Sequence, residues 1–356
     1  MRRVCSLLVV LWTACWLLAG RSAQSAEGPN EKYRPRLLLS LPEEYNTPDG
    51  MALCPKTNNI FLSCPNFNKK EHPGAILKIT PDNRWELFCL MPKHPDTGYG
   101  CPMGLAFGPD GNLYVADNQY FYDKNYKSRL VRINIKDGKA TGADVVVDGF
   151  KLANAVIWRG NEVFVSDTFF DLPDRPGASG VYRFRLEELD KPVRLKPAPN
   201  DPHLIAQCQT GPNKRNEMAG ADGLAFDHEG NLYTGNFGDG TMFKISFDAQ
   251  GKATTKVFVR DPALPCVDGL FFDPVAKVIY VADSQCNAIK VVTLDGKVSV
   301  LWENDDTDGS EGLLDQPCEV LLRGNEMIIA NFDMPLPGLK NTKFDKPYTL
   351  SVIKLR

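Results

Sequence analysis

The sequence predicts an all-β fold, a six-bladed β-propeller with four antiparallel strands in each blade. The first observation is a motif that recurs along the chain. It reads ADGLAFDHEGNLY at residues 221–233 and MGLAFGPDGNLYVAD at residues 103–117, and it returns within residues 267–283. A recurring motif indicates an architecture built from similar units. The second observation is that each unit contains short apolar runs and hairpin turns without a helical period.

One unit shows how the four strands are predicted. An apolar run at residues 224–226 passes through a Gly-Asn turn into residues 232–233, and Gly-Asn between apolar runs is typical of a β-hairpin. A third run at residues 242–247 and a fourth at residues 255–259 complete the blade.

Aligning the predicted first strands counts the blades. Successive positions are separated by 54, 51, 68, 46 and 51 residues, by subtraction, and they are Asp49, Met103, Asn154, Asp222, Asp268 and Glu319. The long interval contains a Pro-rich stretch at residues 192–212, which we interpret as a surface loop. The last blade ends at residues 348–355 without a fourth strand. Residues 36–41 form a spare strand that is expected to pair there, closing the ring and hiding an edge.

The N-terminal residues 1–26 are predicted to be a signal peptide, and residues 27–356 to be the propeller. Arg2 and Arg3 precede an apolar run at residues 7–20, and small residues follow at 23–25. The run is too short to favour a retained membrane helix, although a retained anchor is the alternative. We therefore expect an exported protein, periplasmic or secreted, without a membrane anchor once the signal is removed.

The composition is that of a globular domain, with 356 residues, 43% of them hydrophobic, and a formal net charge of -3. The absence of a basic block argues against a nucleic-acid partner and leaves a small-molecule substrate as the expected partner. The composition does not indicate an oligomeric state.

Eight cysteines follow the signal, and their even number in an exported chain permits disulfides. Cys54 and Cys64 flank one predicted hairpin and are the best local pair, while buried free thiols are the alternative. The eight are Cys54, Cys64, Cys89, Cys101, Cys208, Cys266, Cys286 and Cys318.

Two rings of polar residues are expected at one mouth of the channel. A first strand lines the channel and the second strand runs antiparallel to it, so the start of one and the end of the other share a face. The first ring consists of the six aligned positions. The second ring, with Asn66 nearby in the first blade, consists of Asp117 with Asn118, Asp167, Asn236, Asp283, and Asn331 with Asp333.

Carboxylates converging on a channel repel one another, and a bound divalent cation removes this conflict. Carboxylate and amide oxygens are ligands for hard ions such as calcium or magnesium. None of the 4 His residues occupies a ring position, which argues against a histidine zinc site and a Ser-His-Asp triad.

A structural role competes with metal binding. The shared Ala/Ser-Asp context of Asp117, Asp167 and Asp283 favours caps of backbone amides. The side chain varies at the first-ring position among Asn154, Asp222 and Glu319, which favours function there. For Asp49 and Asp268 both roles remain open.

With this ring in place, the chain resembles the senescence marker protein/gluconolactonase (regucalcin-like) family of six-bladed propellers. The resemblance is most specific in residues 221–240 and in LANAVIW at residues 152–158. It implies one divalent cation held by a Glu, two Asn and an Asp from first-strand starts, with the Asp also acting as base in lactone hydrolysis.

By this resemblance Asp222 matches the family Asp, and Asn154 matches the Asn one blade earlier. The second Asn of the family pattern corresponds to Met103, one blade before Asn154, and the Met103 side chain cannot supply an oxygen. The Glu of the pattern lies two further blades back around the ring, where this chain has Glu319. Asn118 could reach in to fill the gap. The implied metal ligands are therefore Glu319, Asn154, Asp222 and Asn118, with Ca²⁺ expected and Mg²⁺, Mn²⁺ or Zn²⁺ as alternatives.

The resulting hypothesis is a metal-dependent hydrolase acting on a sugar lactone or related cyclic ester. The cation would polarise the carbonyl, and Asp222 or Asp268 would deprotonate water. Insertions in the chain are expected to form a substrate rim whose aromatic walls include Tyr120, Tyr122, Phe169 and Phe170.

Two alternatives remain. A non-catalytic NHL-type propeller would bind a glycan or protein, and its second strands share the text YVADS found at residues 280–284. A strictosidine synthase-like propeller would use Glu319 as acid and base, whereas a quinone-dependent oxidoreductase usually needs His and Arg at the channel.

Overall fold

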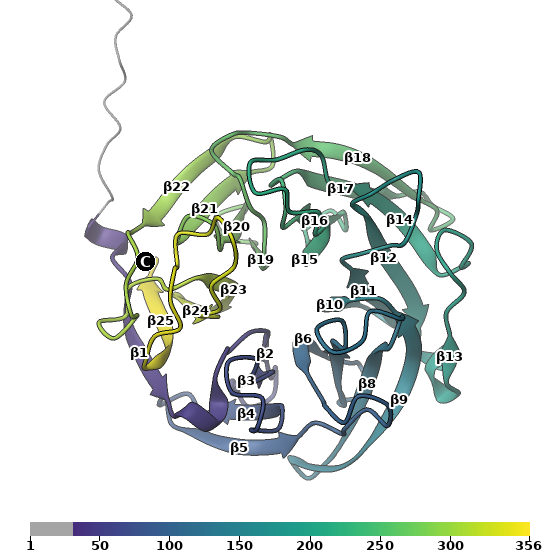
Figure 1. Cartoon of the computed structure of the whole chain (residues 1–356), viewed down its shortest axis with the longest axis horizontal. Coiled ribbons are helices and arrows are strands. Elements are labelled where there is room, and N and C mark those ends of the chain that lie inside the picture. The colour runs from purple at the N-terminus through teal and green to yellow at the C-terminus, as the bar shows by residue number, and fades with distance from the viewer. Residues whose placement is uncertain (1–30) are drawn as a thin grey trace, which may run out of the picture.

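The computed structural model describes residues 31–356, and the predicted signal peptide lies outside the described residues. Six β-sheets surround a central axis, so the predicted six-bladed propeller is confirmed (Figure 1). The first strand of each blade lies innermost, beside the central axis. Besides the strands, the described chain contains the short 3-10 helices η1 (Glu31–Tyr33), η2 (Glu43–Tyr45) and η3 (Leu186–Asp190).

The first three blades follow one another along the chain. Blade 1 comprises β2 (Met51–Leu53), β3 (Ile60–Cys64), β4 (Ala75–Ile79) and β5 (Trp85–Leu90). Blade 2 comprises β6 (Pro102–Phe107), β7 (Leu113–Asp117), β8 (Ser128–Lys136) and β9 (Lys139–Phe150). Blade 3 comprises β10 (Ala153–Arg159), β11 (Glu162–Asp167), β12 (Ala178–Arg185) and β14 (Leu204–Gln209).

The last three blades complete the circle. Blade 4 comprises β15 (Ala221–Phe226), β16 (Leu232–Asn236), β17 (Met242–Phe247) and β18 (Ala253–Val259). Blade 5 comprises β19 (Leu270–Asp273), β20 (Val278–Asp283), β21 (Ala288–Thr293) and β22 (Val298–Glu303). Blade 6 comprises β23 (Pro317–Arg323), β24 (Glu326–Asn331), β25 (Tyr348–Lys354) and β1 (Arg36–Leu41).

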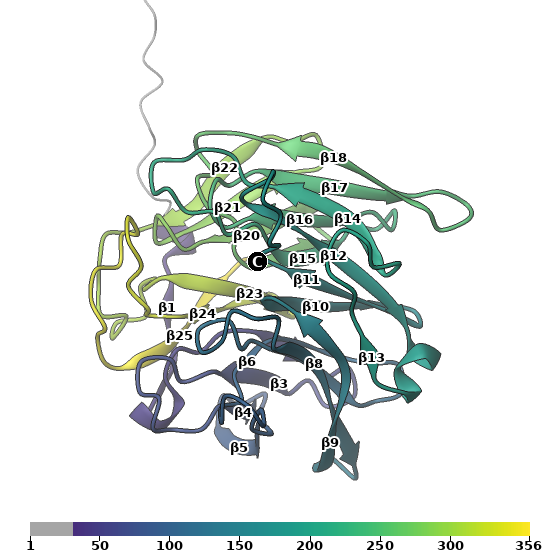
Figure 2. The same cartoon turned by 45° about the vertical axis from the view of Figure 1, so that its right-hand side comes forward.

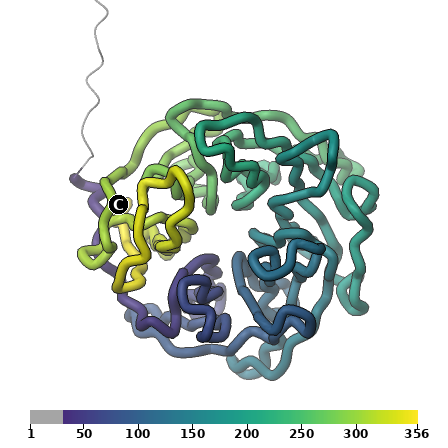
Figure 3. Tube along the Cα trace, in the orientation of Figure 1, coloured from purple at the N-terminus to yellow at the C-terminus, as the bar shows by residue number. Residues whose placement is uncertain are grey.

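The ring closes as predicted, through the N-terminal strand. β1 pairs antiparallel with β25, from Arg36 opposite Val352 to Leu41 opposite Tyr348. Figure 3 shows this seam as the purple start of the described chain beside its yellow end. The pairing satisfies the outer edge of β25, which would otherwise be open to another chain.

The Pro-rich stretch at residues 192–212 is not only a surface loop, and this expectation was wrong. Leu204–Gln209 forms the outer strand of blade 3, where inward-facing Ala206 and Cys208 alternate with exposed neighbours. Val193–Arg194 forms β13, which pairs parallel with β9 at the outer edge of the molecule (Figure 2). The prolines flank these strands without interrupting them, since Pro is excluded only where a ladder N–H is required.

The repeated glycine explains how the blades pack at the axis. A Cβ on Gly223 would lie 2.3 Å from the carbonyl oxygen of Asp268, and one on Gly104 would lie 2.6 Å from that of Asn154. Side chains are therefore excluded where one first strand meets the next. The motif places its polar residue directly before this contact, at the channel.

The proposed Cys54–Cys64 pair is wrong, because the register of blade 1 separates the two residues. Cys54 lies beside Asn59 at one end of the hairpin, whereas Cys64 pairs with Ala75 at the far end of β3. Cys64 lies four strand residues beyond Ile60, so about 13 Å of β3 separates it from the end of the hairpin where Cys54 lies. This distance is well outside the Cα separation of a disulfide. All eight cysteines of residues 31–356 are free. No helix in that range is long and apolar enough to cross a membrane.

Candidate functional site

A cavity of about 230 Å³ opens where the first strands begin. Its walls combine carboxylates, amides and aromatic rings, and none of the described residues that line it is Lys, Arg or His. The polar members are Asp49, Asn118, Asn154, Thr168, Glu217, Asp222, Asp268 and Gln316. The apolar and aromatic members include Met103, Tyr120, Phe121, Phe169, Phe237, Phe332 and Leu336.

A β-bulge lies at the start of the first strand, at the position of the ring residue that faces the channel. In blade 4, Ala221 pairs with Asn236 and Leu224 with Thr234, so three residues span the distance that two span on the partner. The same register shift occurs in blades 2, 3 and 6. Bulges re-aim side chains, and here Asp222 lines the cavity.

The register corrects the first ring in blade 6. Pro317 pairs with Asn331 as Ala221 pairs with Asn236, so Cys318 and not Glu319 occupies the position of Asp222. Glu319 takes the place of the axial glycine. Its carboxylate lines a separate cavity of about 450 Å³ whose other lining residues are apolar, glycine or proline. This segment contains no glycine to mark the register, which is why the sequence alignment was displaced by one residue.

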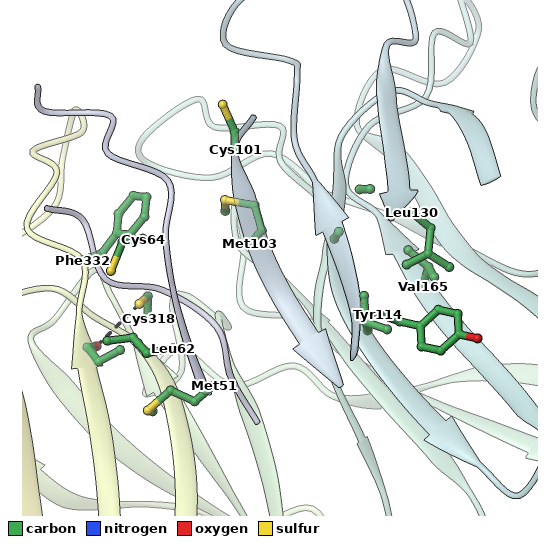
Figure 4. Packing of buried hydrophobic residues seen from close by; sticks show 14 of the residues in the cluster. Met51, Leu62, Cys64, Cys101, Met103, Tyr114, Leu130, Val165, Cys318 and Phe332 are labelled. Atoms are coloured by element: carbon green, nitrogen blue, oxygen red, sulfur yellow. Dashed lines mark hydrogen bonds between the residues drawn. The ribbon is translucent and has the colours of Figure 1, made fainter. Parts of the chain in front are cut away.

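Cys318 closes this side of the ring as a neutral thiol. Its Sγ lies within hydrogen-bond distance of the carbonyl oxygens of Pro48, at 3.3 Å, and Ala330, at 3.5 Å. Figure 4 shows Cys318 on the last blade, with a dashed hydrogen bond beside it, and Met103 on β6. Burial raises the pKa of the Cys318 thiol well above its usual value.

Burial disfavours ionisation of the three ring carboxyl groups, and the charges of neighbouring acids add to this effect at Asp222 and Asp268. Asp49 and Asp222 are 7% and 6% exposed, and the Asp222 carboxyl hydrogen-bonds to that of Asp268. Burial, followed by the charges of Asp268 and Asp49, raises the pKa of Asp222 well above its usual range. Burial also raises the pKa of Asp268, and that of Asp49 to about 7. Repulsion within the Asp222–Asp268 pair therefore favours the state in which one of the two carboxyl groups is protonated.

Two of these carboxyl groups have additional partners that fix them. Ser284 Oγ donates to Asp268 Oδ2 at 2.7 Å. Cys318 hydrogen-bonds to Asp49 and opposes the effect of burial on its pKa. These contacts hold the acids toward the channel without neutralising them.

The amides present different atoms to the cavity. Asn118 Oδ1 accepts from the Tyr120 backbone N–H at 2.9 Å, and its buried Nδ2 has no hydrogen-bond partner in the described chain. Asn118 therefore offers a hydrogen-bond donor, whereas the sequence-based hypothesis assigned it a metal-binding oxygen. Asn154 donates from Nδ2 to Thr168 Oγ1 at 3.4 Å, so its carbonyl oxygen is the atom left for a ligand.

Half of the predicted rim lines the cavity. Tyr120 and Phe169 do so and stack with ring centroids 4.8 Å apart. Tyr122 instead stacks on Tyr99 at 4.0 Å, and Phe170 is buried in the core against Tyr182. In both positions the aromatic ring packs against a residue of another segment, a role that the sequence could not distinguish from a rim.

Several wall residues were missed by the sequence reasoning. Glu217 and Phe237 come from the connections beside blade 4, and Phe332 and Gln316 from blade 6. Phe237 directly follows the second-ring residue Asn236, and Phe332 follows Asn331, so the residue after each ring position was the available signal.

The second ring is structural where it was expected to be. Asp117 accepts from the backbone N–H of Cys101 at 2.7 Å and from Arg129 Nε at 2.8 Å. Asp167 accepts from the N–H groups of Lys151 and Leu152 at 3.0 and 2.7 Å. Asp283 accepts from the Cys286 N–H at 3.2 Å. These buried acids fix the segment entering the channel or the following turn.

The donor set fits a hard divalent cation chemically, since it consists of carboxylates and an amide oxygen. No group of three His, Cys, Asp or Glu side chains within residues 31–356 is arranged to hold a metal ion as it stands. The raised pKa values of Asp222 and Asp268 instead favour a proton on one of the two carboxyl groups. Metal binding would replace that proton, because like charges at close range require compensation.

Structural comparison identifies the class of fold. A gluconolactonase from Xanthomonas campestris superposes with a TM-score of 0.57 at 13% identity, over 92% of this chain and 97% of that one. The calcium-binding protein regucalcin from Agrobacterium tumefaciens superposes with a TM-score of 0.58 at 12% identity, over 91% and 96%. No protein-family model matches the chain, and no curated protein matches it in sequence.

The same fold also carries other chemistry. A PQQ-bound aldose sugar dehydrogenase from Streptomyces coelicolor superposes with a TM-score of 0.54 at 15% identity, over 92% of this chain and 99% of that one. At these identities the comparisons establish a shared six-bladed propeller. The activity has to be argued from the cavity.

Proposed function

We propose that this protein is a hydrolase of a small, uncharged cyclic ester such as a sugar lactone, and that a divalent cation binds in the cavity. The observation that carries the proposal is the convergence of Asp49, Asp222 and Asp268 on one cavity without a basic residue in its lining. Buried carboxyl groups with raised pKa values are common at sites of acid-base or metal chemistry.

The cation ligands that we propose differ from those expected from the sequence. In this assignment the Asp of the family pattern corresponds to Asp268 in blade 5. The two Asn of the pattern then correspond to Asp222 in blade 4 and Asn154 in blade 3, and the Glu corresponds to Asp49 in blade 1. All four residues line the same cavity, and the count bypasses Met103. Calcium is the proposed ion, because its flexible coordination accepts carboxylate and amide oxygens.

A bound cation would polarise the ester carbonyl and stabilise the negative charge that develops on its oxygen. The protein supplies the proton transfers through Asp222 and Asp268. With the cation bound and both carboxyl groups ionised, one of them would accept a proton from the attacking water and pass it to the ring oxygen as the ring C–O bond breaks. Ser284 positions Asp268 for this role.

Other side chains would position the substrate. The unpartnered Nδ2 of Asn118 is a donor for a substrate hydroxyl or carbonyl oxygen. Leaving this buried donor unpaired is costly, so a substrate that accepts from it is favoured over one that does not. The stacked rings of Tyr120 and Phe169 offer an apolar face to a sugar ring and exclude water from the site.

The charge and size of the cavity define the substrate class. Acidic residues line it and basic residues do not, so uncharged substrates are favoured over phosphorylated or carboxylated ones. Its volume of about 230 Å³ lies below that of typical drug-sized sites and suits a single small ring. Hydrolysis of a lactone creates a carboxylate, which this cavity would repel. We also propose that the protein is exported, in keeping with its N-terminal sequence.

The test is a lactone panel assayed with the purified protein after chelation and with added calcium, magnesium, manganese or zinc. We expect cation-dependent turnover, and Asp222→Asn and Asp268→Asn should each lower kcat by at least ~10²-fold. Asp305→Asn is the matched control, because its side chain is fully exposed outside the cavity. Full turnover in both ring variants would refute the mechanism. A protein that holds no cation and hydrolyses no ester would instead favour a non-catalytic binding propeller.

A further inference from the structure

A second acidic cluster lies in the loops of blade 6, behind the cavity wall. Asp315 directly precedes the wall residue Gln316, and Asp333 directly follows the wall residue Phe332. The two segments are tied together, since the Phe332 N–H donates to the Gln316 carbonyl oxygen at 2.9 Å. Both acids are 2% exposed, so the cluster is as buried as the ring at the channel.

Asp315 is the unusual member of this cluster. Its Oδ1 is buried and has no hydrogen-bond partner in the described chain. Asp333, by contrast, accepts from Asn341 Nδ2 at 3.2 Å and from the Asp345 N–H at 3.1 Å. A buried carboxylate without a donor is expensive, and protein structures resolve this by pairing, protonation or an ion.

No basic side chain pairs with the cluster in the described structure. Burial, followed by the charges of Asp333, Asp345, Asp306 and Asp308, raises the pKa of Asp315 to about 9.

The lysines of the neighbouring loop are directed elsewhere. Lys340 pairs with Glu303 at 2.9 Å and Lys346 with Glu43 at 2.6 Å, while Lys343 is exposed. The cluster therefore lacks the counter-charge that its burial requires.

The loop before Asp315 closes over it. Gly309 adopts φ 66°, and a Cβ there would lie 2.7 Å from Thr349 Oγ1 and 3.4 Å from the Cβ of Asp315. Only glycine fits this close approach without strain. The loop at Gly309 thus packs against both Asp315 and the β25 residue Thr349.

We infer that Asp315 and Asp333 bind a hard divalent cation of the calcium class, at a site separate from the channel ring. No third His, Cys, Asp or Glu side chain of the described chain completes a metal site with Asp315 and Asp333, so carbonyl oxygens and water would complete the coordination, which calcium accepts. Binding would join residues 305–316 to residues 333–345. Because Leu336 of the second segment lines the cavity, the ion would hold part of the cavity wall in place.

The experiment separates this site from the ring. Calcium binding is measured by titration calorimetry, and Tm is measured with and without calcium, in the wild type and in Asp222→Asn/Asp268→Asn. The ring variant should retain one class of calcium site and a Tm increase of roughly 5 °C at a hundredfold excess over Kd. Adding Asp315→Asn to that background should weaken the remaining binding at least tenfold, and Asp333→Asn should do the same.

Asp305→Asn provides the control in the same loop, and it should leave calcium binding unchanged. The inference is overturned if Asp315→Asn keeps the affinity of its parent, or if the ring variant shows no calcium response at all. If the double ring variant does not fold, the wild type and the single Asp315→Asn variant are compared by stoichiometry. Loss of one site then supports the inference, and equal stoichiometry refutes it. Neither result depends on whether the protein hydrolyses lactones.

Discussion

The two rings of polar residues at the channel mouth contain the same residue types and have opposite surroundings. In the second ring, Asp117 is held by a backbone amide, a glutamine amide and a buried guanidinium. In the first ring, Asp222 faces the cavity and hydrogen-bonds to another acid. Both positions are buried, so burial alone does not distinguish a structural carboxylate from a functional one.

The difference lies in how each carboxylate is compensated. Hydrogen-bond donors from the backbone and from Arg129 compensate Asp117 and Asp167, and these bonds stabilise the fold. The first-ring acids have few protein donors, so their energy is lowered by a proton or a ligand. Substitutions that neutralise a carboxyl group should therefore have opposite effects in the two rings.

The largest effect on stability is expected from Asp117→Asn. Arg129, with a side chain only 6% exposed, would lose its ionised partner, and breaking a buried ion pair costs about 3–5 kcal/mol. The free energy of unfolding is measured by urea denaturation. Asp222→Asn, measured in the same way without metal, should unfold with equal or greater free energy. Equal losses in the two variants would contradict the division between the rings.

The pH dependence of stability provides an intermediate test. Asp49 titrates near 4 in the unfolded chain and at about 7 in the fold, so the folded protein binds more protons between these values. Protonation of Asp49 therefore favours the folded state, fully below about pH 4. The free energy of unfolding falls as the pH rises to about 7, with a slope of up to ~1.4 kcal/mol per pH unit.

Unfolding of the metal-free wild type and of Asp49→Asn between pH 4 and 8 checks this expectation. The variant should lose less stability over the interval than the wild type. Added calcium should flatten the wild-type curve, because the ion stabilises the ionised acids. A variant with the wild-type slope would show that Asp49 does not carry the extra proton.

The smallest effect is expected from Glu319→Gln. Burial raises the pKa of Glu319 well above its usual value, and its carboxyl group lines the cavity at the other end of the channel. The bond from the Val320 N–H to Glu319 Oε1, 2.8 Å long, can be kept by the amide oxygen. We expect a stability change within about 0.5 kcal/mol and an unchanged cation affinity. A tenfold loss of calcium affinity in Glu319→Gln would contradict this expectation and support the sequence-based hypothesis that Glu319 binds the cation.

Much of the fold could be predicted because its signals are local. The repeated motif counted the blades, and the alternating pattern gave the bounds of β17 and of the closing strand β1 as observed. Asp222, Asp268, Asn154 and Asn118 were correctly expected at one mouth, since strand direction follows from the hairpins. The outer strand β14 was missed because prolines flank a short run of weak pattern.

The sequence by itself determined the periodicity of this protein, the direction of its strands and the chemistry available at the channel. Only the tertiary structure decided which acids face a cavity and which are fastened to the backbone. It also decided that Cys318 takes the ring position and Glu319 the opposite cavity, and that Asp315 and Asp333 come together. The physical reason is that a bulge or a one-residue register change redirects a side chain, and that the compensation of a buried charge depends on groups from distant segments.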